Sequence, residues 1–175
     1  MEMANSPRLV VIGLGYVGLP LAVALAKHFP TIGFDIDSAR VAELKSGHDR
    51  TREVDAEALA ASRLEVTDAA DDCRGADVYI VTVPTPVDAD NRPDLGAVLA
   101  ATRMVAGCID PARRPTIVYE STVYPGVTEE ICGPELEKVG LVRGRDFRLG
   151  YSPERINPGD REHSIERITK VIAGE

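Results

Sequence analysis

The chain has 175 residues, a formal net charge of −8 and 44% hydrophobic residues, which suits one globular domain with its own core. Its lysines and arginines are scattered, which argues against nucleic acid or an anionic membrane surface as the main partner. No apolar run approaches the roughly 18 residues that span a bilayer. Residues 1–7 have an early acid and no apolar core, so we interpret them as a polar lead-in and not as a signal peptide.

The cysteines are Cys73, Cys108 and Cys132, an odd number at wide spacings without a CxxC pair. This pattern predicts reduced thiols, buried or half-buried, in a cytoplasmic protein rather than a disulfide framework. The histidines have no spacing typical of a metal site. We therefore expect no bound metal.

Short apolar runs alternate with helical segments along the chain and predict an α/β fold. We expect a Rossmann-like, mostly parallel sheet with helices on both faces, in a single domain over residues 8–175. The predicted strands cover 8–12, 31–34, 63–67, 77–83, 115–119, 147–151 and 168–173. The predicted helical segments cover 15–28, 38–44, a short helix ending at 61, a turn at 68–73, 95–107 capped by Asp94, and 125–139.

The first predicted strand leads directly into Gly13, Gly15 and Gly18, in the order G-x-G-x-x-G, and a helical run follows. In a dinucleotide site the first glycine turns the chain, the second lets the backbone approach a pyrophosphate, and the third lets helix and strand pack closely. The pyrophosphate then lies at the positive end of the helix. We expect Tyr16 and Val17, within the same loop, to contact the cofactor as well.

Asp35 follows the second predicted strand. A carboxylate at this place accepts hydrogen bonds from the adenosine ribose hydroxyls and repels a 2′-phosphate, which favours NAD over NADP. A glycine-rich turn without a ligand is the alternative interpretation. Because strand, glycines, helix and acid follow one another in register, the pattern predicts an NAD site.

The ends of the predicted strands gather the other candidate residues, because ligands of open parallel sheets bind at the carboxyl ends of the strands. The expected site combines 13–18, Asp35, 82–85, 120–122 and 152–157. The position of Ser121 and Thr122, at a strand end facing the cofactor, favours a functional role for both residues. Thr82 and Thr85 fit turn caps as well as cofactor contacts, and Glu154 fits a solvated acid as well as a site carboxylate. Arg155 fits a surface position as well as a diphosphate ligand.

Four separated motifs resemble one family: VIGLGYVGLP at 11–20, VPTP at 83–86, ESTVYPG at 120–126 and YSPERINPG at 151–159. By their order and wording the chain is identified as a member of the UDP-glucose/GDP-mannose dehydrogenase family, and it resembles the N-terminal, NAD-binding domain. The resemblance implies oxidation of the C6 alcohol of a nucleotide sugar, through an aldehyde to a carboxylate, with two NAD reduced. It also implies a cysteine nucleophile for the second oxidation.

The resemblance further implies roles for single residues. Thr122 orients a catalytic water or the sugar hydroxyl, and Glu154 lines the sugar site. Thr85 and Ser121 flank the nicotinamide ribose, and Arg40 lies near the adenosine end. The predicted sets are catalytic Thr122 and Glu154; cofactor-binding Gly13, Gly15, Tyr16, Val17, Gly18, Asp35, Arg40, Thr82, Pro84, Thr85, Ser121 and Thr122; and substrate-binding Glu154, Arg155 and Asn157.

Two features depart from the family pattern. None of the three cysteines has the glycine-rich setting of the family's nucleophile, so we expect a truncated piece without the central helix and sugar-nucleotide domain, inactive alone. Pro158 stands where the UDP-glucose branch has a second acid. This difference favours a UDP-N-acetylhexosamine, oxidised to its uronic acid for surface polysaccharide.

The resemblance also implies a cytoplasmic enzyme that is a homodimer at full length, of which this piece alone can be a monomer. Two other interpretations are a stand-alone, non-enzymatic dinucleotide-sensing module and a hydroxyacid dehydrogenase with a similar half-sheet. The second of these leaves the SPERINPG segment at 152–159 unexplained.

Overall fold

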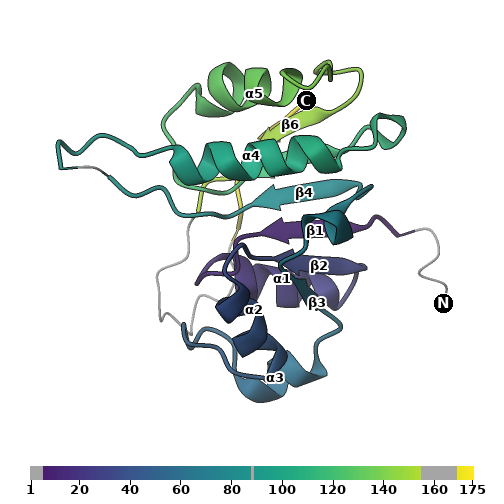
Figure 1. Cartoon of the computed structure of the whole chain (residues 1–175), viewed down its shortest axis with the longest axis vertical. Coiled ribbons are helices and arrows are strands. Elements are labelled where there is room, and N and C mark those ends of the chain that lie inside the picture. The colour runs from purple at the N-terminus through teal and green to yellow at the C-terminus, as the bar shows by residue number, and fades with distance from the viewer. Residues whose placement is uncertain (1–5, 88, 155–168) are drawn as a thin grey trace.

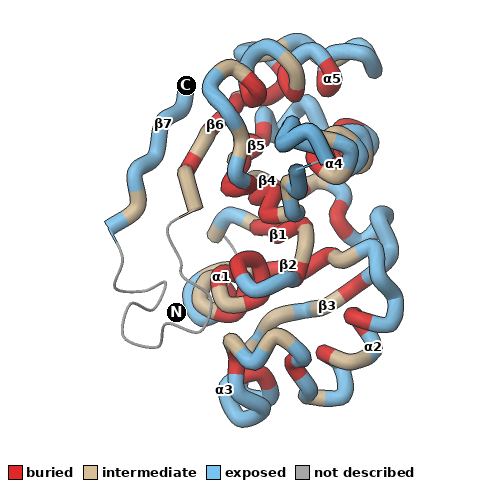
Figure 2. The backbone as a smooth tube through the Cα atoms, turned by 90° about the vertical axis from the view of Figure 1, so that its left-hand side faces the viewer, coloured by how far each residue is buried: buried red, intermediate tan, exposed pale blue. Residues whose placement is uncertain are grey.

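The computed structural model describes residues 6–87, 89–154 and 169–175. Within these ranges, seven strands form one sheet in the order β3-β2-β1-β4-β5-β6-β7, shown edge to edge in Figure 2. The strands are β1 (Leu9–Ile12), β2 (Thr31–Phe34), β3 (Glu65–Thr67), β4 (Val78–Val81), β5 (Thr116–Tyr119), β6 (Arg148–Tyr151) and β7 (Ala173–Gly174). All neighbours pair in parallel except β7, which runs antiparallel to β6. The sheet confirms the predicted Rossmann-like class.

The helices connect the parallel strands, as a parallel sheet requires. They are α1 (Gly18–Ala26), α2 (Ser38–Lys45), α3 (Ala56–Ala61), α4 (Gly96–Cys108) and α5 (Gly133–Glu137). Shorter turns are η2 (Ala70–Cys73), η3 (Pro111–Arg113) and the π-helical η4 (Val127–Cys132). Figure 2 places α1 and α4 on opposite sides of the central strands.

Alternate residues of β1 supply the two halves of the core, because successive side chains of a strand point to opposite faces. Val10 and Ile12 pack in the cluster that includes Val98 and Val105 of α4. Val11 packs in the cluster that includes Leu19 of α1. Burial on both faces explains why β1 is a continuous apolar run rather than an alternating one.

Two predicted elements differ from the structure. The helix expected at 125–139 is divided into η4 and α5, and Pro134 lies in the first turn of α5, where its missing N–H cannot extend a regular helical ladder from the preceding turn. The strand expected at 168–173 is limited to Ala173–Gly174, while Val171 and Ile172 are exposed. Ile168 lies outside the described residues.

The predicted cap of α4 is shifted by one residue: the helix begins at Gly96 with Leu95 as its N-cap, and the Asp94 carboxylate, one residue earlier, accepts a hydrogen bond from Gly96 N–H at 2.8 Å. Cys73, Cys108 and Cys132 are buried and free of disulfides, as the cysteine pattern predicted, and burial raises the pKa of the Cys73 thiol to about 12. Among the described helices none is long and apolar enough to cross a bilayer.

The strand order reverses between β1 and β4, because the chain leaves β1 toward β2 on one side and later returns to β4 on the other. This switch point opens a crevice at the carboxyl ends of the strands. The loop between β4 and α4 extends outward from the same side of the sheet, at the left of Figure 1.

Candidate cofactor site

A cavity of about 860 Å³ lies at this switch point. Its walls come from the loop after β1, the ends of β2, β4 and β5, and one face of α4. The predicted residues that line it are Gly13, Gly15, Tyr16, Val17, Asp35, Thr82, Pro84, Thr85, Ser121, Thr122 and Glu154. Arg155 and Asn157, the other two predicted substrate contacts, lie outside the described residues. Strand ends far apart in the chain thus share one cavity.

The glycine loop between β1 and α1 is shaped by steric need. Gly13 has a φ of +91°, in the left-handed region that favours glycine. A Cβ on Gly18 would lie 1.8 Å from the Gly13 carbonyl oxygen and 2.4 Å from the Thr82 hydroxyl, so only glycine fits there. At Gly15, by contrast, a Cβ would have no described heavy atom within 4 Å. The space beside Gly15 is open for a group that approaches the backbone closely.

Asp35, directly after β2, holds this loop in place. Its carboxylate accepts hydrogen bonds from Leu14 N–H at 2.8 Å and from Asp37 N–H at 2.9 Å. The Leu14 side chain is completely buried and occupies the space over Gly33, where a Cβ would come within 2.9 Å of it. Asp35 is only half-buried and lines the cavity, so its carboxylate can accept further hydrogen bonds there.

Arg40 is placed differently from the prediction that it contacts the cofactor. Its guanidinium is 2% exposed and donates to Leu14 O at 3.0 Å, to Glu43 at 2.9 Å and to Asp49 at 2.7 Å. The side chain lies behind the loop and does not line the cavity. Arg40 therefore supports the loop from within the protein, because its guanidinium is paired with the buried Asp49 and the partly buried Glu43 and not with a group in the cavity.

Asp49 completes this buried network. It also accepts hydrogen bonds from Thr51 Oγ1 at 2.7 Å and Val54 N–H at 3.0 Å. Burial by itself would raise the pKa of Asp49, but the hydrogen bonds from Thr51, Val54 and Arg40 outweigh it and lower the pKa below its usual value. The carboxylate is thus ionised in the folded chain at neutral pH.

Arg50 is a cavity residue that sequence reasoning did not single out. Its half-exposed guanidinium donates to the Asp37 carboxylate at 2.7 Å. The Asp37 bond raises the pKa of Arg50 despite partial desolvation, so the group carries its positive charge beside Asp35. No local motif marks Arg50, because it reaches the cavity from the loop after α2 through tertiary contacts. We call this side of the cavity, with Asp35, Ile36, Asp37 and Arg50, the β2 end.

Three predicted hydroxyls join strand ends to each other. The Thr82 hydroxyl lies 2.7 Å from Gly13 O and 3.0 Å from Ile12 O. The Thr85 hydroxyl donates to Thr122 O at 2.6 Å, and the Ser121 hydroxyl donates to Val83 O at 2.7 Å. Each hydroxyl bonds to a carbonyl of a segment far away in the sequence, so the bonds of Thr82 and Thr85 join strand ends and are not local turn caps.

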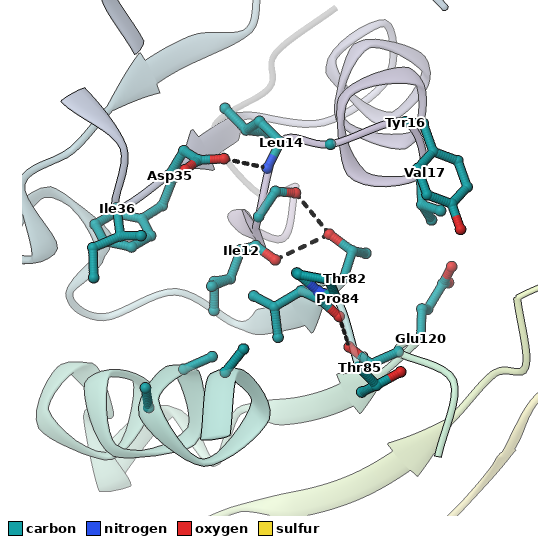
Figure 3. A pocket seen from close by; sticks show the side chains of 18 of the residues that line it. Ile12, Leu14, Tyr16, Val17, Asp35, Ile36, Thr82, Pro84, Thr85 and Glu120 are labelled. Atoms are coloured by element: carbon teal, nitrogen blue, oxygen red, sulfur yellow. Dashed lines mark hydrogen bonds between the residues drawn. The ribbon is translucent and has the colours of Figure 1, made fainter. Parts of the chain in front are cut away.

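The opposite side of the cavity, with Glu120, Ser121 and Thr122, is the β5 end. Thr122 is exposed, whereas Glu120 is 6% exposed and its carboxylate accepts a hydrogen bond from the Lys170 ammonium. Burial raises the pKa of Glu120, the nearby Glu154 adds to the rise, and Lys170 works in the opposite direction. Figure 3 shows the Glu120 carboxylate extending from the strand end into the space below Tyr16 and Val17.

The donor set fits NAD. Open space at Gly15 and the loop N–H groups at the start of α1 suit a pyrophosphate, and the Asp35 carboxylate suits a ribose diol. Within the described residues, no group of three or more His, Cys, Asp or Glu side chains is arranged to hold a metal ion. The cavity therefore has the features of a dinucleotide site.

The model of the UDP-glucose/GDP-mannose dehydrogenase family, NAD binding domain, matches residues 7–175. CapL of Staphylococcus aureus is 52% identical over 168 residues, which are 95% of this chain and 39% of that protein. The UDP-N-acetyl-D-glucosamine 6-dehydrogenase of Pseudomonas aeruginosa is 50% identical over 95% of this chain and 40% of its own length.

The solved structure of the UDP-D-ManNAc dehydrogenase of Pyrococcus horikoshii superimposes with a TM-score of 0.83 at 36% identity, over 95% of this chain and 41% of that one. The chain thus spans about two fifths of the length of these relatives. It belongs to the UDP-glucose/GDP-mannose dehydrogenase family, as the NAD-binding domain.

Proposed function

We propose that the cavity binds one NAD with its adenosine at the β2 end and its nicotinamide at the β5 end. In this arrangement Asp35 accepts hydrogen bonds from the adenosine ribose hydroxyls, and the pyrophosphate lies beside Gly15 at the start of α1. Ile36, which is 85% exposed, and the Arg50 guanidinium offer an apolar and a cationic surface to the adenine ring. The single observation that carries the proposal is that Asp35, Gly15 and Thr122 line one continuous cavity.

We further propose that the chain is part of a longer enzyme that oxidises the C6 alcohol of a UDP-N-acetylhexosamine to the uronic acid. Relatives named for UDP-N-acetyl-D-glucosamine and UDP-N-acetyl-D-mannosamine support this substrate class. When bound, NAD accepts the hydride of each oxidation step. The uronic acid product serves surface polysaccharide synthesis. In this proposal the enzyme acts in the cytoplasm as a homodimer. We take residues 1–7 as a lead-in to the domain at 8–175.

In this proposal Thr122 and Glu154 act on the sugar. Thr122 lies at the exposed rim of the β5 end, and Glu154 is half-buried on the same cavity wall. The Thr122 hydroxyl can orient a water or the sugar hydroxyl by donating or accepting a hydrogen bond. The Glu154 carboxylate can accept a proton or a hydrogen bond from the sugar. Arg155 and Asn157 stay predictions.

Isothermal titration of the chain with NAD and NADP tests cofactor binding. We expect a dissociation constant at least about tenfold lower for NAD, because the Asp35 carboxylate repels a 2′-phosphate. Equal affinities, or tighter binding of NADP, would contradict the proposal.

Turnover tests the enzymatic part, in the longer protein that carries this domain. Thr122→Val and Glu154→Gln should each lower the rate of NADH formation with UDP-N-acetylhexosamine by about 100-fold, and Glu154→Gln should do so without changing NAD affinity. Thr116→Val, at the far end of β5, and Glu57→Gln, on exposed α3, are the matched controls. If no UDP-sugar yields NADH, the enzymatic assignment is wrong.

A further inference from the structure

Glu120 and Lys170 form an ion pair that the proposed function does not use. Glu120 follows β5, and Lys170 precedes β7 in a segment fifty residues further along the chain. Their side chains are 6% and 19% exposed. Two charges removed from water to this degree cost free energy even when they are paired, so the position needs a reason beyond stability.

Glu120 belongs to the cavity wall, whereas Lys170 is not among the residues that line the cavity. One carboxylate oxygen, Oε2, accepts the hydrogen bond from Lys170. Figure 3 shows the carboxylate directed into the space below Tyr16 and Val17 rather than back toward the sheet. An ionised carboxylate in a mostly apolar wall is an acceptor that can recognise a hydrogen-bond donor on a ligand.

The order of the strands indicates which donor this is. The β2 end holds the adenosine, the loop after β1 holds the pyrophosphate, and β4 and then β5 follow on the other side. Neighbouring strands are about 4.8 Å apart, so Glu120 lies two strands, or about 10 Å, from the loop across the sheet. The nicotinamide ribose is attached directly to the pyrophosphate and falls near β4. On the nicotinamide side of the pyrophosphate, the nicotinamide ring with its carboxamide is the part of NAD farthest from the loop, and the carboxamide carries an N–H₂ donor.

We propose that the Glu120 carboxylate binds the carboxamide N–H₂ of the nicotinamide and that Lys170 is a positioning residue that keeps this carboxylate oriented. This inference rests on the proposed NAD site and assigns a residue to its nicotinamide end. Val17, 7% exposed, offers an apolar contact to the ring beside the same space. A carboxylate in this place also rejects a ligand that carries a second carboxylate there.

The electrostatics agree with this role. Burial and the neighbouring Glu154 raise the pKa of Glu120, while the Lys170 ammonium opposes the rise. Loss of Lys170 would remove an ammonium that stabilises the charged form of Glu120. A hydrogen bond to an ionised acceptor is stronger than one to a neutral acceptor, so Lys170 affects cofactor affinity without touching the cofactor.

Titration with three ligands tests the proposal on the 175-residue chain: NAD, ADP-ribose, which lacks the nicotinamide, and nicotinic acid adenine dinucleotide, which has a carboxylate in place of the carboxamide. The parent chain should bind NAD about tenfold or more tightly than the acid analogue. Glu120→Gln should weaken NAD by about tenfold, leave ADP-ribose within about twofold, and remove most of the discrimination against the acid analogue. Lys170→Met should weaken NAD in the same selective way.

Glu57→Gln, which removes one negative charge from exposed α3, is the matched control and should change none of the three affinities. Circular dichroism establishes that each variant is folded. Equal weakening of NAD and ADP-ribose by Glu120→Gln, or an unchanged ratio of NAD to acid analogue, would overturn this inference while leaving the NAD site in place. A parent chain that binds neither NAD nor ADP-ribose would overturn the proposed NAD site itself.

Discussion

Polar side chains line both ends of the cavity, but at the β2 end they also fix the glycine loop, whereas at the β5 end Glu120 is tied to the edge of the sheet through Lys170. Asp35 holds Leu14, and Arg40 is enclosed by Asp49, Glu43 and the Leu14 carbonyl. Thr122 and Glu120 line the wall at the other end, as Asp35 does at this one, but Glu120 is paired with Lys170 and not with the loop. The difference indicates a division of labour: one end fixes the shape of the cofactor loop, and the other presents groups to the reacting part of the ligand.

The two ends also differ in how burial acts on their carboxyl groups. Hydrogen bonds within the protein overcome burial at Asp49 and lower its pKa, whereas burial prevails at Glu120 and raises its pKa. Asp49 is therefore satisfied by the folded chain, while at Glu120 burial still opposes the charged form, which a ligand donor would favour. Substitutions in the buried network of Arg40 and Asp49 should change folding stability, and substitutions at the β5 end should change ligand binding.

The largest expected effect is at Gly18, which packs against the Gly13 carbonyl and the Thr82 hydroxyl. Gly18→Ala would place a Cβ 1.8 Å from the Gly13 carbonyl oxygen, and backbone must move to relieve that contact. We expect a loss of more than about 3 kcal/mol in the free energy of unfolding, or failure to fold, measured by urea denaturation.

Gly15→Ala is the control for this variant, because its added methyl group would enter open space. It should cost less than about 1 kcal/mol of stability and should weaken NAD binding by crowding the pyrophosphate. Similar stabilities for the two variants would show that the loop yields more readily than the structure indicates.

Asp49→Asn tests whether the β2 end depends on its buried network. The variant leaves the 2% exposed Arg40 guanidinium without its closest carboxylate, and breaking a buried ion pair costs about 3 kcal/mol. Urea denaturation at neutral pH should show this loss. The exposed pair Arg74 and Asp71 provides the control, since Asp71→Asn should change stability by less than about 1 kcal/mol.

Thr82→Val tests the connection between the two ends and should have a smaller effect. It removes a hydroxyl that lies within hydrogen-bonding distance of the Ile12 and Gly13 carbonyls while keeping the shape of the side chain. A lost neutral hydrogen bond costs about 1 kcal/mol, measurable as a lower thermal midpoint. If Thr82 instead served the cofactor alone, stability would be unchanged and only NAD affinity would fall.

The smallest effect is the pH dependence that Asp49 contributes. The pKa of Asp49 is lower in the folded chain than in the unfolded chain, where it is about 3.9. The stability that Asp49 provides is therefore fully present above the unfolded pKa and is lost as the pH falls through the folded pKa. Between pH 5 and pH 2.5, roughly the window set by these pKa values, the parent should lose more stability than Asp49→Asn. Parallel pH profiles would indicate that Asp49 does not carry the difference.

The sequence predicted the sheet and most of the site because both follow from local patterns. The β-branched runs become buried strands, the glycine order produces the loop, and Asp35 falls at the end of β2. Strand ends meet by topology alone, so Thr122 and Glu154 could be assigned to one cavity without any contact being known.

The remaining features depend on tertiary contacts that have no local pattern. The inward turn of Arg40 depends on Asp49, nine residues away, and the pair of Glu120 with Lys170 depends on the edge strand β7. Pro134 lies where the structure divides the helix predicted at 125–139 into η4 and α5. The prediction followed the long apolar and acidic run around Pro134 and so missed the division. Which polar groups are satisfied by the protein cannot be read from their residue types.

The Leu14 side chain over Gly33 has a consequence for the thermodynamics of binding. A loop with three glycines would ordinarily sample many conformations and lose that freedom when a ligand arrives. Here a buried leucine anchors the middle of the loop to β2, so the loss of freedom occurs during folding. NAD should therefore meet a preorganised loop, and its binding entropy should include little cost from ordering the backbone.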